Sequence, residues 1–182
     1  MNKIDLIKFL NDNKISLGIA SKKTEIRKIN NLIGSGRFAI EDIDENEIVY
    51  KNGGLWLTHD ERKNFEEDYF HLIDKAYFFQ GGLSPELNGS HNHSCDPNCY
   101  VEDYTVRAIR NIKKDEQLTI DYSSFINHNY VILNKCGCGA SDCREVVTGL
   151  DWLIYDLPEK YNYKVSSEIL RHYLNIQKEK HS

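Results

Sequence analysis

The sequence predicts a mostly β fold, with short strands in small sheets, few helices and a helical tail at the C-terminal end. Three observations support this fold class: glycines interrupt the central part of the chain, the apolar runs between them are short, and the last stretch has apolar side chains at helical spacing. A chain of 182 residues can bury a core but is short for two large domains, so we expect one principal domain.

The expected elements follow from local patterns along the chain. Residues 4–10 place apolar side chains on one face of a short helix, which predicts an N-terminal helical extension over residues 1–30. A Thr-x-x-Glu capping box begins a stretch with apolar side chains at helical spacing, which predicts one helix over residues 58–73. Near the other end, Ser166 can cap a final helix. Short apolar runs predict strands at residues 47–50, 77–79, 104–109 and 117–122.

Composition and charge limit the function classes. The formal net charge is -5, which argues against direct binding to nucleic acid and suits a basic protein partner. No run approaches the roughly 18 apolar residues of a membrane span, and the first residues lack the pattern of a secretory signal. We therefore expect no membrane partner and a cytoplasmic location, with the nucleus of its own or of a host cell as the alternative. The oligomeric state stays open.

Three cysteines lie within the short segment Cys136-Gly-Cys138-Gly-Ala-Ser-Asp-Cys143. Such spacing in an intracellular chain is typical of metal ligands, and the glycines permit the tight backbone that a shared ion requires. Structural zinc takes four ligands in a tetrahedron, so a fourth ligand must come from elsewhere in the chain. Cys95 and Cys99 are the remaining thiols, and either could complete the site.

Two further motifs are ambiguous when each is considered alone. Residues 92–98, with the sequence NHSCDPN, form a turn rich in polar side chains that can bond locally. A nucleophilic pair of His93 and Cys95 is the weaker interpretation, because residues two apart need not touch. Residues 34–39 match the loose glycine fingerprint of dinucleotide-binding proteins, but the residues that follow leave no room for the required helix. We expect instead a turn between strands whose backbone approaches a ligand.

The order of these motifs is more informative than any one of them. The glycine pair at residues 34–36, then NHSCDPN, then Leu118-Thr-Ile-Asp-Tyr122, then Cys-x-Cys-x4-Cys closely resembles the SET family of protein lysine methyltransferases with its post-SET zinc segment. The resemblance covers roughly residues 33–144, and the chain beyond it is similar to the tail of small stand-alone bacterial members. It implies the SET-type fold with its knot-like crossing, S-adenosylmethionine as cofactor and a structural zinc ion.

The resemblance also implies roles for particular residues. Tyr122 matches the catalytic tyrosine, and Tyr77 falls where a second tyrosine lines the lysine channel. Ile120 lies two residues before Tyr122, at the channel position linked to the number of methyl groups added. Cys95 is implied as the zinc ligand that joins the three clustered cysteines. The implied cofactor-binding residues are Gly34, Ser35, Gly36, Arg37, Phe38, Asn92 and His93.

Two details qualify the resemblance. Residues 86–91 depart from the family pattern just before the NHSC turn, so the approach to the cofactor pocket is altered. Ile120 offers no hydroxyl to hold a water beside the amine, so we expect that di- or trimethylation is sterically allowed. The chain then divides into an N-terminal helical extension (1–30), a SET catalytic domain (31–125), a post-SET zinc-binding segment (126–152) and a C-terminal helical tail (153–182).

The function that the resemblance implies is transfer of methyl groups to the side-chain amine of a lysine in a protein substrate, such as a histone or another basic protein. Two alternatives stay open. One is a catalytically inactive, zinc-braced SET-like module that binds a protein partner. The other is a nucleotide-dependent oxidoreductase, which the glycine loop alone would suggest.

Overall fold

In the residues that the structure describes, short strands form small sheets and helices gather near the C-terminal end, which confirms the predicted mostly β class. The structure is a computed structural model. It describes residues 18–30, 34–52, 54–57, 60, 70–73, 76–80, 91–102 and 105–180. The knot-like crossing stays a prediction.

The largest sheet has the strand order β1-β4-β10-β9-β11-β8. Its strands are β1 (Gly18–Ala20), β4 (Ile48–Asn52), β8 (Asn92–His93), β9 (Cys99–Glu102), β10 (Thr105–Ala108) and β11 (Thr119–Ile120). Strands β1, β4, β10 and β9 pair antiparallel, whereas β11 pairs parallel with both β9 and β8. The parallel pairing matters for function because it sets the NHSC turn beside the segment that leads to Tyr122.

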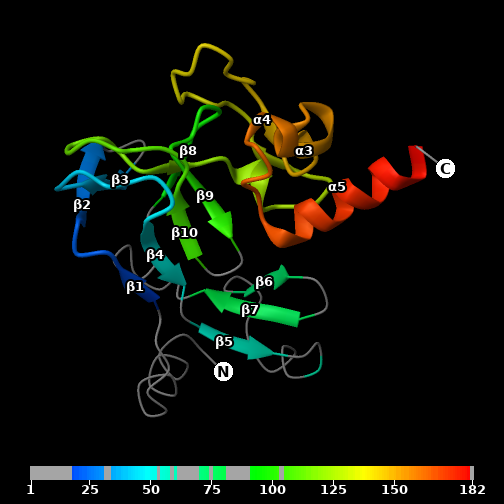
Figure 1. Cartoon of the computed structure of the whole chain (residues 1–182), viewed down its shortest axis with the longest axis horizontal. Helices are drawn as coiled ribbons and strands as arrows, with labels where there is room; N and C mark the ends of the chain where they lie inside the picture. The colour runs from blue at the N-terminus through cyan, green and yellow to red at the C-terminus, as the bar shows by residue number, and fades with distance from the viewer. Residues whose placement is uncertain are drawn as a thin grey trace.

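Three smaller sheets complete the β structure. Strands β2 (Thr24–Asn30) and β3 (Gly34–Ala39) form a hairpin, and β12 (Val131–Leu133) pairs with β13 (Val147–Thr148). Strands β5 (Gly54–Leu57), β7 (Ala76–Gln80) and β6 (Phe70–Ile73) form a three-stranded sheet in that order. Figure 1 shows the β2–β3 hairpin on one side of strands β8–β10 and the C-terminal helices on the other.

Three of the expected elements differ in the structure. Residues 70–73 form strand β6, paired antiparallel with β7, so the predicted helix over 58–73 is wrong at its end. Residues 18–20 and 24–30 are strands, so the N-terminal extension is not helical there. Residues 34–39 form strand β3 and not a turn. The expected helix over residues 4–10 lies outside the described residues.

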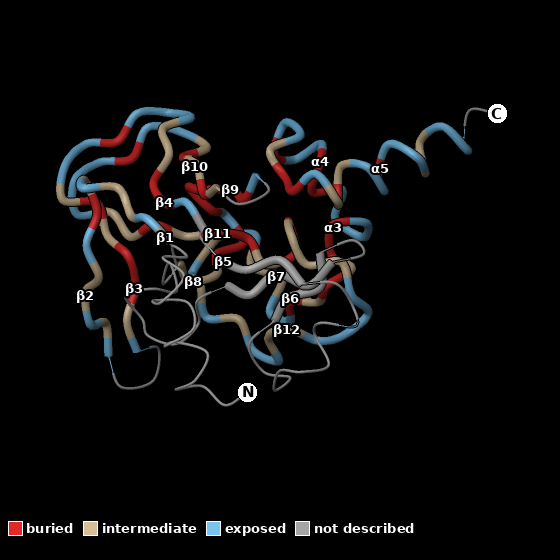
Figure 2. Tube along the Cα trace, turned by 90° about the horizontal axis from the view of Figure 1, so that it is seen from below, coloured by how far each residue is buried: buried red, intermediate tan, exposed pale blue. Residues whose placement is uncertain are grey.

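The main core lies between the large sheet and the segments that cross it. Its buried residues come from β3, β4, β9, β10 and β11 and from the turns beside them, as the red tube in Figure 2 shows. They are Ala39, Ile43, Val49, Tyr50, Cys99, Val101, Val106, Ala108, Ile112, Leu118 and Ile120. Tyr122 and Phe125 pack against this cluster from its edge, so the candidate catalytic tyrosine stands on a rigid base.

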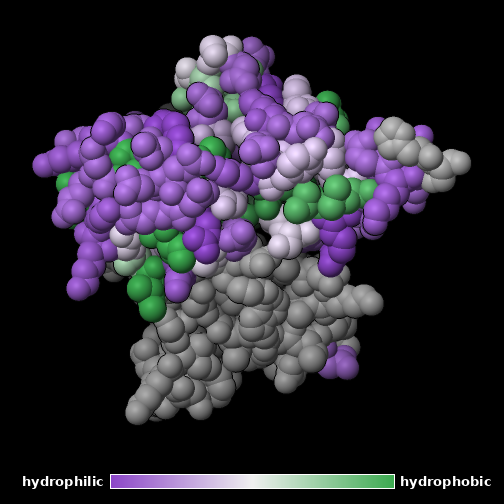
Figure 3. Space-filling model, in the orientation of Figure 1, coloured by the Kyte–Doolittle hydropathy of each residue, from purple (hydrophilic) through white to green (hydrophobic). Residues whose placement is uncertain are grey.

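The C-terminal helices are α3 (Asp151–Ile154), α4 (Leu157–Lys160) and α5 (Ser167–Lys180). The predicted final helix is confirmed, and Ser166 Oγ accepts a hydrogen bond from Ile169 N at 3.4 Å, as expected of a cap. These helices share a second core of Trp152, Leu157, Tyr161, Val165, Ile169 and Tyr173. The described part of the face in Figure 3 is mainly hydrophilic, with a band of hydrophobic side chains over α5. Each helix in the described ranges is too short or too polar to cross a membrane.

Candidate active site and metal centre

Three segments far apart in the sequence meet at the edge of the large sheet. The parallel register sets Thr119 opposite Asn92 and Ile120 opposite His93. The side-chain amide of Asn92 then reaches β3, where its Nδ2 donates to the backbone oxygen of Ser35 at 3.1 Å. The predicted cofactor residues of the NHSC turn and of the glycine strand are therefore brought together, beside the strand that precedes Tyr122.

Gly36 stands at the tightest point of this junction. A Cβ atom on Gly36 would lie 2.5 Å from Gln117 Nε2 and 2.9 Å from both Asn92 Nδ2 and Ile29 Cδ1. These distances are shorter than real Cβ contacts, so a side chain would displace its neighbours. The sequence uses glycine here because β3 packs directly against the NHSC turn and the segment before β11.

The side chain of Arg37 is buried and bonded within the protein, so it is not available to bind a ligand. Its side chain is buried, its Nη1 donates to Thr24 Oγ1 at 2.9 Å, and its guanidinium lies 5.4 Å from the centre of the Tyr50 ring. Burial lowers the pKa of Arg37. We therefore assign the Arg37 side chain to bracing β3, which leaves the backbone of residues 34–38 to meet the predicted cofactor.

Tyr122 begins a short 3-10 helix, Tyr122–Ser124, and Asp121 separates this helix from β11. Its hydroxyl donates to the backbone oxygen of His91 at 3.2 Å, and its ring contacts those of His93 and Phe125. Burial raises the pKa of Tyr122, and a hydrogen bond with the backbone of His93 opposes this shift only in part. The phenol is therefore neutral near pH 7 and is held in one orientation by backbone groups.

His93 links Tyr122 to the cysteine cluster. Its Nδ1 accepts from the backbone N–H of Tyr122 at 3.3 Å, and its Nε2 lies 3.3 Å from Cys95 Sγ. Burial lowers the pKa of His93 to about 4, although Asp121 opposes this shift, so the ring is neutral. A neutral imidazole that accepts at Nδ1 carries its proton on Nε2. His93 therefore donates to the sulfur of Cys95 and cannot use Nε2 to bind a metal ion in this arrangement.

The cysteine cluster has the donor set of a structural zinc site. Single ligand atoms of His93, Cys95, Cys136 and Cys138 all lie within 4.8 Å of one another. Thiolates bound to one zinc ion at about 2.3 Å in a tetrahedron are about 3.8 Å apart, so this spacing fits. Cys143 lies beside this group, and its Sγ donates a weak hydrogen bond to the backbone oxygen of Cys136 at 3.8 Å. The group that the geometry gathers is thus one imidazole and three thiols, with Cys143 beside it.

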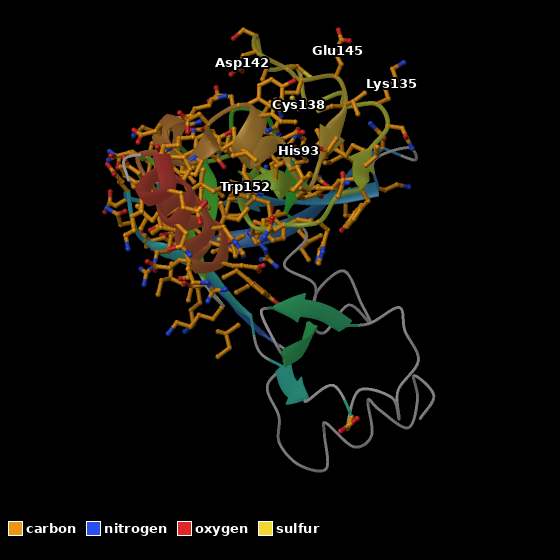
Figure 4. The ribbon with its side chains drawn as sticks, turned by 90° about the vertical axis from the view of Figure 1, so that its right-hand side faces the viewer. His93, Lys135, Cys138, Asp142, Glu145 and Trp152 are labelled. Carbon is orange, nitrogen blue, oxygen red and sulfur yellow. The ribbon has the colours of Figure 1, made fainter. Side chains whose placement is uncertain are left out.

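The same cluster decides between the two candidate thiols of the central chain. The backbone N–H of Cys95 donates to Cys138 Sγ at 3.5 Å, so Cys95 adjoins the cluster. Cys99 lies in β9 within the main core, is fully buried, and burial raises the pKa of its thiol. Figure 4 shows Cys138 and His93 in the interior of this region and Asp142 and Glu145 at its outer end. The structure thus brings Cys95, not Cys99, to Cys136 and Cys138.

A buried ionic network, which no local pattern in the sequence indicated, lies beside the cluster. Asp121 is fully buried, and its Oδ1 accepts from Arg144 Nη2 at 2.6 Å and from Ser123 N at 3.0 Å. Arg144 Nε also lies 3.3 Å from Asp151 Oδ2, and both side chains are almost completely buried. Tyr161 donates to Asp121 Oδ2 at 2.8 Å. The available signal was the position of two charged residues next to Tyr122 and Cys143.

Of the predicted channel residues Ile120 and Tyr77, the structure describes the side chain of Ile120 only. Ile120 is buried in the main core, and Tyr122 packs against that core. Tyr77 lies on β7, but its side chain is outside the described residues, so its channel role stays a prediction. The alternative of a dinucleotide fold lacks its helix, because the residues after β3 form turns and an isolated bridge before β4 begins at Ile48.

Comparison with known proteins gives a family match over the same region. Residues 34–123 match the family model of the SET domain. The histone-lysine N-methyltransferase ASHH2 of Arabidopsis thaliana is 26% identical over 133 residues, which cover 64% of this chain and 8% of that protein. A histone-lysine N-methyltransferase of Candida glabrata, named as specific for H3 lysine 36, is 26% identical over 169 residues, or 79% of this chain and 23% of its own length.

A third relative extends the comparison to an animal. The histone-lysine N-methyltransferase Su(var)3-9 of Drosophila pseudoobscura pseudoobscura is 30% identical over 126 residues, which cover 59% of this chain and 19% of that protein. The chain thus spans less than a quarter of the length of each of these three relatives. All three are eukaryotic, and the similarity to small bacterial members stays a prediction.

Proposed function

We propose, from the premise that this chain belongs to the SET-domain family, that it transfers methyl groups from S-adenosylmethionine to the side-chain amine of a lysine in a protein. The observation that carries the proposal is the meeting of three segments, in which Asn92 bonds to Ser35 and Tyr122 bonds to His91 and His93. A purely binding scaffold has no need of a neutral, backbone-held phenol at this junction.

The residues of the chain suit the demands of methyl transfer. S-adenosylmethionine, when bound, supplies the methyl group from a positively charged sulfur. A lysine amine with a pKa of about 10.4 is mostly protonated at pH 7, and exposing its lone pair costs about 4 to 5 kcal/mol. A site that removes water lowers this cost, because desolvation disfavours the ammonium form. The Tyr122 hydroxyl orients the amine without ionising, since burial raises the pKa of this phenol.

We also propose that Cys95, Cys136, Cys138 and Cys143 hold a structural zinc ion. The close approach of the thiols and the donor role of His93 toward Cys95 support this set. Burial opposes ionisation of these thiols and raises the pKa of Cys95 and Cys136. At Cys138, hydrogen bonds from backbone N–H groups outweigh burial and lower the pKa to about 7, which favours the thiolate there. Zinc would fasten the segment after the SET domain onto the NHSC turn, and it would take no part in the transfer itself.

The substrate that we propose is a histone or another basic protein. The net charge of -5 favours a basic partner, and the relatives are named as histone-lysine methyltransferases. The aliphatic side chain of Ile120 supports di- or trimethyl products. The location that we propose is the cytoplasm, with the nucleus of its own or of a host cell as the alternative, and imaging of the tagged chain tests it.

The central experiment is radiolabelled methyl transfer from S-adenosylmethionine to a mixture of basic proteins by the zinc-loaded chain. Tyr122→Phe should lower the rate by about 100-fold, because it removes the hydroxyl that orients the amine. Tyr130→Phe is a matched control, since Tyr130 is half exposed and stacks on His128 away from this junction. Equal rates for the two variants would contradict the role of Tyr122.

Calorimetry separates the alternatives. Binding of S-adenosylmethionine together with methyl transfer supports the proposal. Binding without transfer to any basic protein would favour the inactive, zinc-braced module. Binding of NAD in place of S-adenosylmethionine would favour the oxidoreductase, and affinity for neither cofactor at millimolar concentrations would end the assignment.

A further inference from the structure

The ring of Tyr161 is buried in the core of the C-terminal helices, but its hydroxyl points out of that core. The ring packs with Trp152, Leu157, Val165, Ile169 and Tyr173 of the C-terminal helices. The oxygen, however, lies 2.8 Å from Asp121 Oδ2 and 3.1 Å from the backbone oxygen of Cys95. A phenylalanine would fill the apolar cluster equally well, so packing does not explain why the sequence has a hydroxyl here.

Asp121, the acceptor of that hydrogen bond, controls the backbone at Tyr122. Its side chain caps the 3-10 helix Tyr122–Ser124 by accepting from Ser123 N at 3.0 Å. Its backbone oxygen also accepts from Ser124 Oγ at 2.7 Å. Arg144 and Ser123 both bond to Oδ1, whereas the hydrogen bond described for Oδ2 comes from Tyr161. A fully buried carboxylate needs donors on both oxygens to stay in one orientation.

Lys160, the residue before Tyr161, links the end of α4 to the cysteine segment. Lys160 Nζ donates to the backbone oxygen of Cys95 at 3.1 Å and also pairs with the carboxylate of Asp142. The end of α4 therefore touches the NHSC turn, the loop between Cys138 and Cys143 and the residue before Tyr122. These three segments carry the candidate cofactor residues, the candidate zinc ligands and the candidate catalytic residue.

From this arrangement we infer that Tyr161 is a positioning residue: its hydroxyl fixes Asp121, and through Asp121 it fixes the orientation of Tyr122 for methyl transfer. The inference rests on the proposed function for its consequence in catalysis. Tyr161 does not reach the reacting atoms itself. Burial and the Asp121 carboxylate both raise the pKa of Tyr161, so its hydroxyl keeps its proton and donates throughout the physiological pH range.

The test compares Tyr161→Phe with Tyr173→Phe. Both tyrosines lie in the same core and both lose one hydroxyl, but the hydroxyl of Tyr173 bonds to Glu159. We expect kcat for methyl transfer to fall about tenfold in Tyr161→Phe, the effect of about 1.4 kcal/mol, with KM for S-adenosylmethionine changed less than about twofold. Tyr173→Phe should keep the wild-type kcat. A merely structural role would lower the amount of folded enzyme without this split.

Hydrogen exchange gives a second measurement that does not depend on activity. The amides of Ser123 and Ser124 should exchange about tenfold faster in Tyr161→Phe than in the wild type, and at the wild-type rate in Tyr173→Phe. If the wild type transfers no methyl groups, the proposed function fails, and the exchange rates alone then decide whether Tyr161 holds this turn. Unchanged exchange and unchanged kcat in Tyr161→Phe would overturn the inference.

A third variant covers the case in which Tyr161→Phe does not fold. Incorporation of 4-aminophenylalanine at position 161 keeps the ring and an N–H donor in place of the hydroxyl. It should restore folding, slow exchange at Ser123 and most of the wild-type kcat. Failure of this variant to fold would show that the donor to Asp121 is not the feature that matters, and it would overturn the inference as well.

Discussion

Replacing Arg144 with methionine should destabilise the protein more than removing any other positively charged side chain in the ion pairs described here. Arg144 is 4% exposed and pairs with two carboxylates that are equally buried, at 2.6 Å from Asp121 and 3.3 Å from Asp151. Its guanidinium also lies 5.7 Å from the centre of the Tyr155 ring. Arg144→Met keeps most of the side-chain volume but leaves both carboxylates without this cation.

The magnitude follows from where these charges lie. Removing one partner of a buried ion pair costs about 3 to 5 kcal/mol, because the remaining charge keeps its desolvation penalty and loses its compensation. For an exposed pair the cost is about 0 to 1 kcal/mol. Arg110 provides the exposed comparison, since it is 54% exposed and pairs with Glu116 at 2.9 Å. The expected difference between Arg144→Met and Arg110→Met is therefore at least about 2 kcal/mol.

Urea denaturation of the zinc-loaded protein measures this difference. With an m-value of about 2 kcal/mol per molar urea, Arg144→Met should lower the midpoint by about 2 M and Arg110→Met by less than about 0.5 M. The zinc content of each variant is measured at the same time, so that loss of metal is recognised as a separate cause. Equal midpoints for the two variants, with zinc retained, would refute the claim that the network is a buried ionic unit.

Three other predictions concern zinc, packing and pH. Cys95→Ser should lose bound zinc in elemental analysis, whereas Cys99→Ala should retain it, because Cys99 lies in the main core. Gly149→Ala should lower the free energy of unfolding by about 2 kcal/mol, since its Cβ would lie 2.1 Å from the backbone oxygen of His128. Burial lowers the pKa of His91 to about 3, so between pH 6.5 and 3 the unfolded chain binds a proton that the folded chain does not. Stability should therefore fall as pH drops below 6.5, by about 1.4 kcal/mol per pH unit, and His91→Gln should remove that part of the slope in denaturation curves.

The sequence predicted the parts of the site that depend on local chemistry. The NHSCDPN turn at residues 92–98 and the cysteine segment can be recognised as motifs, because their characteristic residues are close together in the chain. The cap at Ser166 was predictable for the same reason, since its partner Ile169 is three residues away. Spacing alone did not choose between Cys95 and Cys99, and only the family resemblance implied Cys95. The choice depends on which residue faces the cluster and which faces the core after β8 and β9 are formed.

The errors in secondary structure come from pairings that a local pattern cannot show. The capping box favoured a helix that extends to residue 73, but residues 70–73 pair with β7 across a short connection and become a strand. Strand β2 was missed because its pairing partner was not recognised as a strand. That partner, β3, contains two glycines, and glycine has low strand propensity. In both cases tertiary contacts outweighed the intrinsic preference of the segment.

The buried network explains why the C-terminal helices cannot be treated as an appendage. Tyr161 reaches Asp121 across 40 positions and Arg144 reaches it across 23, so no window of the sequence contains the contact. Each of these residues comes from a different predicted region of the chain: 31–125, 126–152 and 153–182. A chain cut after residue 152 would keep the motifs but leave Asp121 Oδ2 without the donor described here, next to Tyr122. The tail and the catalytic region must therefore fold as one unit for the site to take the geometry seen here.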